Sequence, residues 1–319
     1  MASRAPTHVP PGYSVLAELG SGQTAHVFLA QHDTRGKVAL KLPREELAAQ
    51  PVLRRMFENE VQITLGLRHA NVVAGYEGAP TGNGAFLVLE YCIGGTLDDL
   101  LLNEQKVALS KAQQLIVDVS RGLEHSHARQ VLHRDVKPAN VFLTGEGSAK
   151  LGDFGTGMHI GDDNWERVGT AFYMAPEIFE GNAPTVQSDI YSLGILAYEV
   201  MAGVRPFVGG SYEDLMMAHL TAFPKALAHL REDLSRGAAK VIGTAMARDA
   251  TRRYRTVKEF RQAFMEAAGL GEPQAPAPEL TGRASRKAKP SSPEGADNEQ
   301  GEKRSSGGLF GWLKRKRDI

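Results

Sequence analysis

The segment HRDVKPAN at positions 133–140 places three chemically active side chains close together. Asp135 offers a carboxylate, Lys137 an ammonium two residues later, and Asn140 an amide oxygen five residues after the aspartate. A positioned carboxylate can accept a proton, an ammonium can counter negative charge, and an amide oxygen can bind a hard cation. A proline between the lysine and the asparagine stiffens the interval. One loop would therefore carry a base, a cation and a metal ligand.

A second stretch, LGSGQTAHVFLA at 19–30, carries Gly20 and Gly22, with Ala25 in place of a third glycine. Taken alone, it fits a Rossmann turn, an ordinary glycine hairpin, or a hairpin whose tip lies over phosphates. Because a second strand-like run follows the glycines, a hairpin fits better than a Rossmann turn. Glycine lets backbone N–H groups approach phosphate oxygens, so with the neighbouring motifs we favour the phosphate-covering hairpin.

A lysine and a glutamate that could form an ion pair follow this stretch. The run VALK at 38–41 reads as a strand ending in Lys41, and the helical stretch after it carries Glu60. There the carboxylate could anchor the ammonium and direct it at an anionic ligand. A chance coincidence of the two residues is the plain alternative.

Two further segments, LGDFG at 151–155 and GTAFYMAPE at 169–177, complete a series. With these motifs in this order, the chain resembles the eukaryotic-type (Hanks-type) serine/threonine protein kinase family, in particular a soluble bacterial member. The resemblance covers residues 13–268. It implies an α+β, two-lobed fold and transfer of the γ-phosphoryl group of ATP to Ser or Thr hydroxyls of protein substrates.

The resemblance implies a role for each polar residue near the catalytic loop. Asp135 would accept or orient the proton of the substrate hydroxyl, and Lys137 would counter charge on the phosphoryl group. Asn140 and Asp153 would hold Mg²⁺, with Mn²⁺ as the alternative ion, because both offer hard oxygen ligands. Arg134 would pair with a phosphorylated residue of the activation segment.

The resemblance also places ATP between the lobes. Lys41, held by Glu60, would contact the α- and β-phosphates. Backbone groups of Glu90 and Cys92 would bond the adenine edge, and we interpret the Cys92 thiol as a small apolar filler. The other residues implied in ATP binding are Leu19, Gly20, Gly22, Val27, Ala39 and Phe142.

Residues beyond the catalytic loop would position the substrate and the fold. The segment GTAFYMAPE resembles the serine/threonine branch, in which Thr170 would bond near Asp135 and help seat the substrate. Glu177 would pair with Arg253 as a structural bridge. Asp189, at the start of a buried helix, would accept hydrogen bonds from the backbone of the catalytic loop.

The activation segment departs from the family pattern. Residues 157–169 contain no Ser, Thr or Tyr, although relatives often carry a phosphorylated residue there. We expect Asp162, Asp163 or Glu166 to occupy the pocket beside Arg134 instead, so that the loop orders without phosphorylation. The alternative is an acidic loop with no regulatory role.

The elements that must position these residues fall into two classes. Short strand-like runs at 26–30, 37–42 and 85–90 and one helical stretch at 54–67 predict an N-lobe over 13–89. After a hinge at 90–93, helical patterns predict a C-lobe over 94–268, with helices at 111–127, 188–203, 211–220, 231–246 and 256–268. The stretch 188–203 is apolar around nearly its whole circumference, which predicts a helix in the middle of the lobe. We interpret His125 and His127 as packed helix-end residues and not as metal ligands.

Composition narrows the class of protein. The 319 residues include 37 Lys and Arg and 37 Asp and Glu, so we expect no field that would gather nucleic acid. The single cysteine, Cys92, excludes an internal disulfide and a multi-thiolate metal site. The N-terminus lacks the apolar core of a secretion signal, and no stretch reaches about 18 uninterrupted apolar residues. We expect a cytoplasmic protein.

The composition of the two ends of the chain differs from that of its centre. Residues 1–12 read as flexible, and 269–308 as a disordered linker, because large apolar residues are scarce there. The last segment, 309–319, carries LFGWLKRKR at 309–317, in which apolar residues precede four cations. It fits a peripheral membrane contact, a docking segment for a protein partner, or an unstructured solubilising end.

Two rival functions belong to other classes. A pseudokinase scaffold is disfavoured because all five polar residues of the motifs are present: Lys41, Glu60, Asp135, Asn140 and Asp153. A small-molecule phosphotransferase on a related fold is disfavoured by GTAFYMAPE, the region in which protein kinases receive an extended polypeptide.

Overall fold

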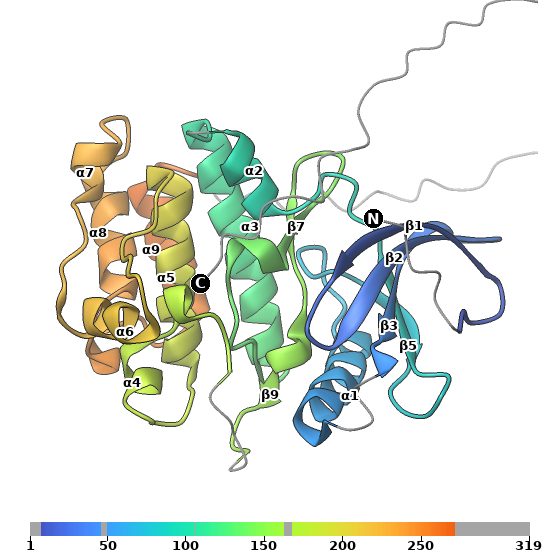
Figure 1. Cartoon of the computed structure of the whole chain (residues 1–319). Helices are drawn as coiled ribbons and strands as arrows, with labels where there is room; N and C mark the ends of the chain where they lie inside the picture. The colour runs from blue at the N-terminus through green and yellow to red at the C-terminus, as the bar shows by residue number, and fades with distance from the viewer. Residues whose placement is uncertain (1–7, 46–49, 105, 163–167, 272–319) are drawn as a thin grey trace, which may run out of the picture.

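The computed structural model describes residues 8–45, 50–104, 106–162 and 168–271, which form two lobes (Figure 1). The N-lobe is an antiparallel sheet with strand order β1-β2-β3-β5-β4 and one helix, α1, beside it. Its elements are β1 Tyr13–Ser21, β2 Ala25–His32, β3 Gly36–Pro43, α1 Pro51–Gly66, β4 Gly75–Ala79 and β5 Phe86–Glu90.

The alternation of side chains along β3 separates the two faces of this sheet. Val38 and Leu40 are buried in one apolar cluster on the first face. Lys41 points to the other face, where Phe57 of α1 packs against Leu87 of β5. The strand register therefore directs Lys41 toward α1 and away from the apolar cluster that contains Val38 and Leu40.

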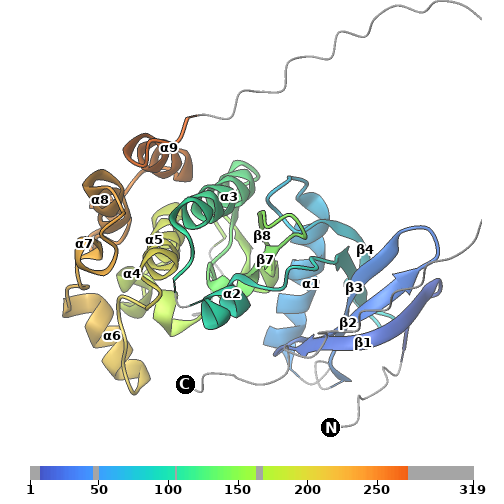
Figure 2. The ribbon, with the colours of Figure 1, turned by 90° about the horizontal axis from the view of Figure 1, so that it is seen from above.

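The C-lobe is helical and carries two short strand pairs, of which Figure 2 labels β7 and β8. Its strands are β6 Val131–Leu132, which pairs with β9 Met158–His159, and β7 Val141–Leu143, which pairs with β8 Ala149–Leu151. Its helices are α2 Leu97–Asn103, α3 Leu109–Ala128, α4 Pro176–Phe179, α5 Val186–Ala202, α6 Tyr212–Thr221, α7 Leu227–Leu230, α8 Arg236–Ala245 and α9 Val257–Ala267.

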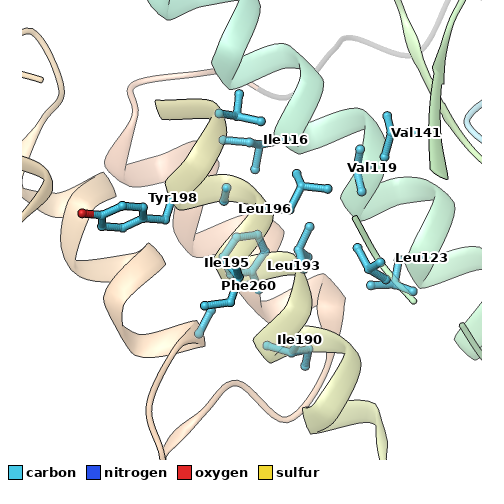
Figure 3. Close-up of a cluster of buried hydrophobic side chains, with 14 of the residues drawn as sticks. Ile116, Val119, Leu123, Val141, Ile190, Leu193, Ile195, Leu196, Tyr198 and Phe260 are labelled. Carbon is cyan, nitrogen blue, oxygen red and sulfur yellow. The ribbon is translucent and has the colours of Figure 1, made fainter. Parts of the chain in front are cut away.

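The helix expected at the centre of the lobe is confirmed as α5, which is buried along almost its whole length. Figure 3 shows Leu193 and Leu196 of α5 near Ile116 and Val119 of α3, and Phe260 of α9 packs in the same cluster. All five side chains are excluded from solvent. The first turn of α5 carries Asp189, which accepts hydrogen bonds from the backbone of the 133–140 loop, so this core fixes the position of the loop.

Some elements differ from the sequence-based expectations. The helical pattern at 231–246 becomes α8 only from Arg236, because the Ser235 side chain caps the helix by accepting from the backbone N–H of Ala238. The short helix α2 was not expected, and a capping box between Thr96 and Asp99 begins it.

Within the described ranges, no helix is both long enough and apolar enough to cross a membrane. The predictions for residues 1–7, for 272–319, and for Asp163 and Glu166 fall outside those ranges.

Candidate active site

The 133–140 loop is held by a buried carboxylate from the first turn of α5. The two carboxylate oxygens of Asp189 accept hydrogen bonds from the backbone N–H groups of His133 and Arg134, each at 2.8 Å. Arg134 has a φ of 68°, a left-handed conformation that costs a non-glycine residue energy. His127 approaches the same carboxylate at 2.8 Å. Burial alone would raise the pKa of Asp189, but the contacts with His127 and His133 hold it below its usual value.

The carboxylate of Asp135 lies at the centre of a polar cluster. Its Oδ2 is 2.6 Å from Lys137 Nζ and 3.0 Å from Asn140 Nδ2. Its Oδ1 accepts a 3.0 Å hydrogen bond from the backbone N–H of Thr170. Lys137 Nζ also donates to the Thr170 hydroxyl at 2.6 Å. The structure thus brings together the four residues that sequence analysis assigned to proton transfer, charge neutralisation, metal binding and substrate seating.

A glycine allows Thr170 to come this close. Gly169 has a φ of +111°, and a Cβ at this position would lie 2.8 Å from the carbonyl oxygen of Arg134. No side chain fits at that distance, so only glycine lets the two segments touch.

A second polar cluster joins the two lobes. Lys41 Nζ of β3 lies 2.5 Å from Glu60 Oε1 of α1 and 3.3 Å from Asp153 Oδ1 of the LGDFG segment. Burial acts to lower the pKa of Lys41, but the carboxylates of Asp153 and Glu60 outweigh it and raise the pKa above its usual value. The Asp153 pKa is lowered, because the attraction of Lys41 outweighs the effect of burial. Lys41 is therefore a fixed positive charge.

Backbone contacts connect the two clusters. The backbone N–H of Gly152 donates to the carbonyl of Asn140 at 2.9 Å, and the Thr156 hydroxyl donates to the carbonyl of His133 at 3.0 Å. Asp153 has a φ of 60°, which turns the chain sharply between β8 and the buried Phe154. Asn140 and Asp153 thus belong to directly bonded segments.

The comparison with known families agrees with this geometry. Residues 13–265 match the model of the protein kinase domain. The chain belongs to the protein kinase family. The match spans both lobes and both polar clusters.

Relatives of this chain among curated proteins include bacterial kinases. Serine/threonine-protein kinase PknB of Mycobacterium tuberculosis is 33% identical over 283 residues, which cover 85% of this chain and 45% of that protein. The probable serine/threonine-protein kinase SCO3848 of Streptomyces coelicolor is 33% identical over 264 residues, covering 78% of this chain and 39% of that protein. The chain therefore spans less than half the length of these relatives.

The residues that the resemblance implies in ATP binding come from both lobes of the kinase domain. Val27 of β2 pairs directly with Lys41, so it shares the inner face of the sheet with Lys41 and Ala39. Phe142 lies on β7 of the C-lobe, and Leu19 lies on β1. Two residues after β5, the buried Cys92 has a pKa that burial raises to about 12, as expected of an apolar filler.

The Glu90 side chain has a contact that sequence analysis did not foresee. Its Oε2 lies 2.8 Å from Lys150 Nζ of β8, and the backbone N–H of Ala74 donates to the same oxygen at 3.3 Å. The Glu90 backbone N–H donates to the Ala74 carbonyl at 2.8 Å. The hinge is therefore tied to both lobes.

The Glu177–Arg253 pair lies away from both polar clusters. Two guanidinium nitrogens of Arg253 donate hydrogen bonds to the two carboxylate oxygens of Glu177, at 2.7 and 2.8 Å. The Arg253 side chain is fully buried. The pair joins the end of the activation segment to the loop that precedes α9.

Of the three acidic residues expected in the pocket beside Arg134, Asp162 is the one that lies in the described part of the activation segment. Asp162 Oδ2 accepts a 3.2 Å hydrogen bond from the backbone N–H of His159. The Arg134 guanidinium contacts the sulfur of Met158 at 3.3 Å.

Sequence analysis missed two groups of site residues. His127 contacts Asp189, although it read only as a packed helix end. The Glu199 carboxylate accepts a 2.5 Å hydrogen bond from the Tyr173 hydroxyl and meets Arg205 Nε at 3.3 Å. His127 and Asp189 are 62 residues apart, and Tyr173 and Glu199 are 26 residues apart. Arg205 lies in a loop without a motif. No local spacing could therefore have indicated these contacts.

Proposed function

We propose that this protein is a serine/threonine protein kinase that transfers the γ-phosphoryl group of ATP to Ser or Thr hydroxyls of protein substrates. The kinase domain would occupy residues 13–268, and the bacterial relatives support a place in bacterial signalling. The single observation that carries the proposal is the convergence of Lys41 on Glu60 at 2.5 Å and on Asp153 at 3.3 Å. A lysine fixed in this way presents its charge where nucleotide phosphates would lie.

The Asp135 cluster supplies the groups that phosphoryl transfer to a hydroxyl requires. Asp135 would accept or orient the hydroxyl proton, and Lys137 would counter the charge of the transferring phosphoryl group. The Thr170 hydroxyl, bonded to Lys137 at 2.6 Å, would help seat the acceptor residue. A pocket beside these groups is lined by Asp135 and Thr170 together with apolar side chains such as Met174.

Asn140 and Asp153 fit a magnesium ion. In the described part of the chain no group of three or more His, Cys, Asp or Glu side chains could form a protein-only metal cage. Mg²⁺ typically uses one or two protein oxygens and takes its other ligands from phosphates and water. When bound, the ion would neutralise charge on the phosphates, and Mn²⁺ is the alternative occupant.

The test is phosphate transfer from labelled ATP to a generic protein substrate. The wild-type protein should transfer phosphate, and Asp135→Asn should lower the rate by about 10²- to 10⁴-fold while still binding ATP. ATP binding without transfer by the wild type would instead favour a pseudokinase scaffold.

We also propose that the activation segment orders without phosphorylation, because residues 157–169 offer no hydroxyl side chain. Asp162, Asp163 or Glu166 would then supply the negative charge beside Arg134. Activity that survives complete phosphatase treatment supports this proposal. Activity lost on treatment and regained by autophosphorylation at Thr156, Thr170 or Tyr173 contradicts it.

For the C-terminal segment 309–317 we propose peripheral contact of a cytoplasmic protein with an anionic membrane. Four cations near such a surface contribute on the order of 4 kcal/mol before any apolar insertion. Anionic liposomes should bind the full chain, and Ser305→Asp with Ser306→Asp should weaken that binding. Equal binding to neutral liposomes, or capture only by a protein partner, contradicts membrane contact.

A further inference from the structure

One arginine that no motif includes ties down the tip of the glycine-rich loop between β1 and β2. Arg44, just after β3, donates from Nε to the carbonyl of Gly22 at 2.8 Å. Its Nη2 donates to the Ser21 hydroxyl at 2.6 Å, and its backbone N–H donates to the carbonyl of Thr24 at 3.0 Å. The side chain and the backbone of one residue thus bind three successive parts of the loop.

The loop depends on such bonds for its shape. The paired register of β1 and β2 ends at Ser21 and His26, and residues 21–23 are exposed. Within the tip, the backbone N–H of Gly22 donates to the carbonyl of Ala25 at 2.8 Å. A loop that contains glycine loses much conformational entropy when it is ordered, so a tether outside the hairpin favours one conformation.

The position of Arg44 relates this tether to the phosphate end of the site. Ala25 pairs with Pro43 across β2 and β3, and Val27 pairs with Lys41. Arg44 therefore lies three residues beyond Lys41, at the end of the sheet where the loop tip folds over. Its positive charge adds to that of Lys41 near an anionic ligand.

We propose that Arg44 is a positioning residue that holds the glycine-rich loop over the phosphates of ATP. The inference rests on the proposed kinase function. The planar guanidinium bonds the Gly22 carbonyl and the Ser21 hydroxyl at once, whereas a lysine ammonium is a flexible point charge. Loss of these two simultaneous hydrogen bonds should therefore weaken MgATP binding more than loss of the positive charge does.

The test compares the binding of two probes, MgATP and adenosine, to the full-length protein by calorimetry. Arg44→Ala should weaken MgATP binding about tenfold and leave adenosine binding unchanged, because adenosine has no phosphates under the loop. Arg44→Lys should resemble Arg44→Ala, and Ser21→Ala should cause a smaller loss. In kinetics, KM for ATP should rise about tenfold in Arg44→Ala, with kcat within about twofold of wild type.

A matched control lies in the turn between β2 and β3, at the opposite end of β3 from Arg44. Arg35, which is exposed and stacks over Tyr76 at 5.1 Å, carries the same charge away from the loop tip. Arg35→Ala should leave both affinities unchanged. The inference is overturned if Arg44→Ala binds MgATP like the wild type, if adenosine binding falls equally, or if Arg44→Lys retains full affinity. A wild-type protein that binds no MgATP overturns the proposed function itself, and the inference with it.

Discussion

The carboxylate of Asp189 accepts a 2.8 Å hydrogen bond from the backbone N–H of Arg134, the residue directly before Asp135. The bond holds Arg134 at a φ of 68° and so sets the direction in which Asp135 leaves the loop. Since the second carboxylate oxygen accepts from His133 and contacts His127, Asp189 satisfies donors from two segments. A residue outside the reacting groups therefore controls the geometry of the candidate base.

Replacing this carboxylate with an amide should separate positioning from folding. In Asp189→Asn one of the two oxygens becomes an NH₂ group, which cannot accept the hydrogen bond of its former donor. We expect kcat to fall about 100-fold, because displacement of a catalytic group by about 1 Å has an effect of this size. The KM for ATP should stay near the wild-type value. Steady-state kinetics of the variant, with near-UV circular dichroism to confirm the fold, measures both effects.

The exposed Asp33, in the turn between β2 and β3, provides the control for this substitution. Asp33→Asn should leave kcat unchanged. An Asp189→Asn protein that is folded and fully active would show that the hydrogen bonds do not position Asp135.

Phosphate transfer should require a divalent metal ion, and the Asp153 carboxylate should set how much of that ion is needed. Chelation of divalent ions should abolish phosphate transfer, and added Mg²⁺ should restore it. Asp153→Asn keeps the size of the side chain but loses its charge, so we expect it to need more than about tenfold higher Mg²⁺ for half-maximal activity. The measurement is a Mg²⁺ titration of activity at constant ATP. Unchanged adenosine binding serves as the internal control, and an unaltered Mg²⁺ requirement would contradict the assignment.

The sequence was most informative where a function is carried by neighbours in the chain. The spacing of Asp135, Lys137 and Asn140 predicted a shared loop, and the structure places Lys137 and Asn140 against the Asp135 carboxylate. The all-round apolar pattern predicted the buried helix α5, because burial leaves no polar face. Local patterns of this kind reflect local physical demands.

Contacts between distant segments could be predicted only where the family resemblance supplied them, as for Glu177 and Arg253. His127 and Asp189 are 62 residues apart, and either residue alone fits an ordinary helix. Arg44 directly follows β3 and reaches Gly22 of the loop between β1 and β2, so only the strand register reveals the contact. The limit of prediction lay in tertiary pairing, which depends on how elements fold back on each other.

The buried pair of Glu177 and Arg253 should govern stability. Arg253→Met removes one partner and leaves a largely buried carboxylate without its cation, which typically costs about 3–5 kcal/mol. Arg253→Lys should not restore stability, since Arg253 also donates to the carbonyls of Gln187, Ala247 and Arg248. Urea unfolding measures the change in the free energy of unfolding.

The exposed neighbour of this arginine gives the comparison. Arg252→Met should change stability by less than about 0.5 kcal/mol. Adding Glu177→Gln to Arg253→Met should recover part of the loss, because the uncompensated charge is then gone. A single Arg253→Met variant as stable as Arg252→Met would refute a structural role for the pair.

A buried histidine should make stability depend on pH. His219 of α6 is fully excluded from solvent, with Nδ1 2.8 Å from the Tyr191 hydroxyl and its ring 4.7 Å from that of Phe207. Burial lowers the pKa of His219 to about 4, from about 6.5 in an unfolded chain. Between these two values the unfolded chain binds a proton that the folded protein does not bind. The free energy of unfolding should therefore fall as the pH falls through this window, by about 3 kcal/mol at its lower end.

Other groups also titrate in this window, so the measurement must be a difference. Urea unfolding of the wild type and of His219→Gln should be compared between about pH 4 and about pH 7, because the variant retains every other titrating group. The stability gap between them should shrink, or reverse, as the pH falls, since only the wild type loses the contribution of a neutral buried imidazole. His159→Gln, at an exposed position, should run parallel to the wild type. If His219→Gln also runs parallel, the buried histidine is not the source of the pH dependence.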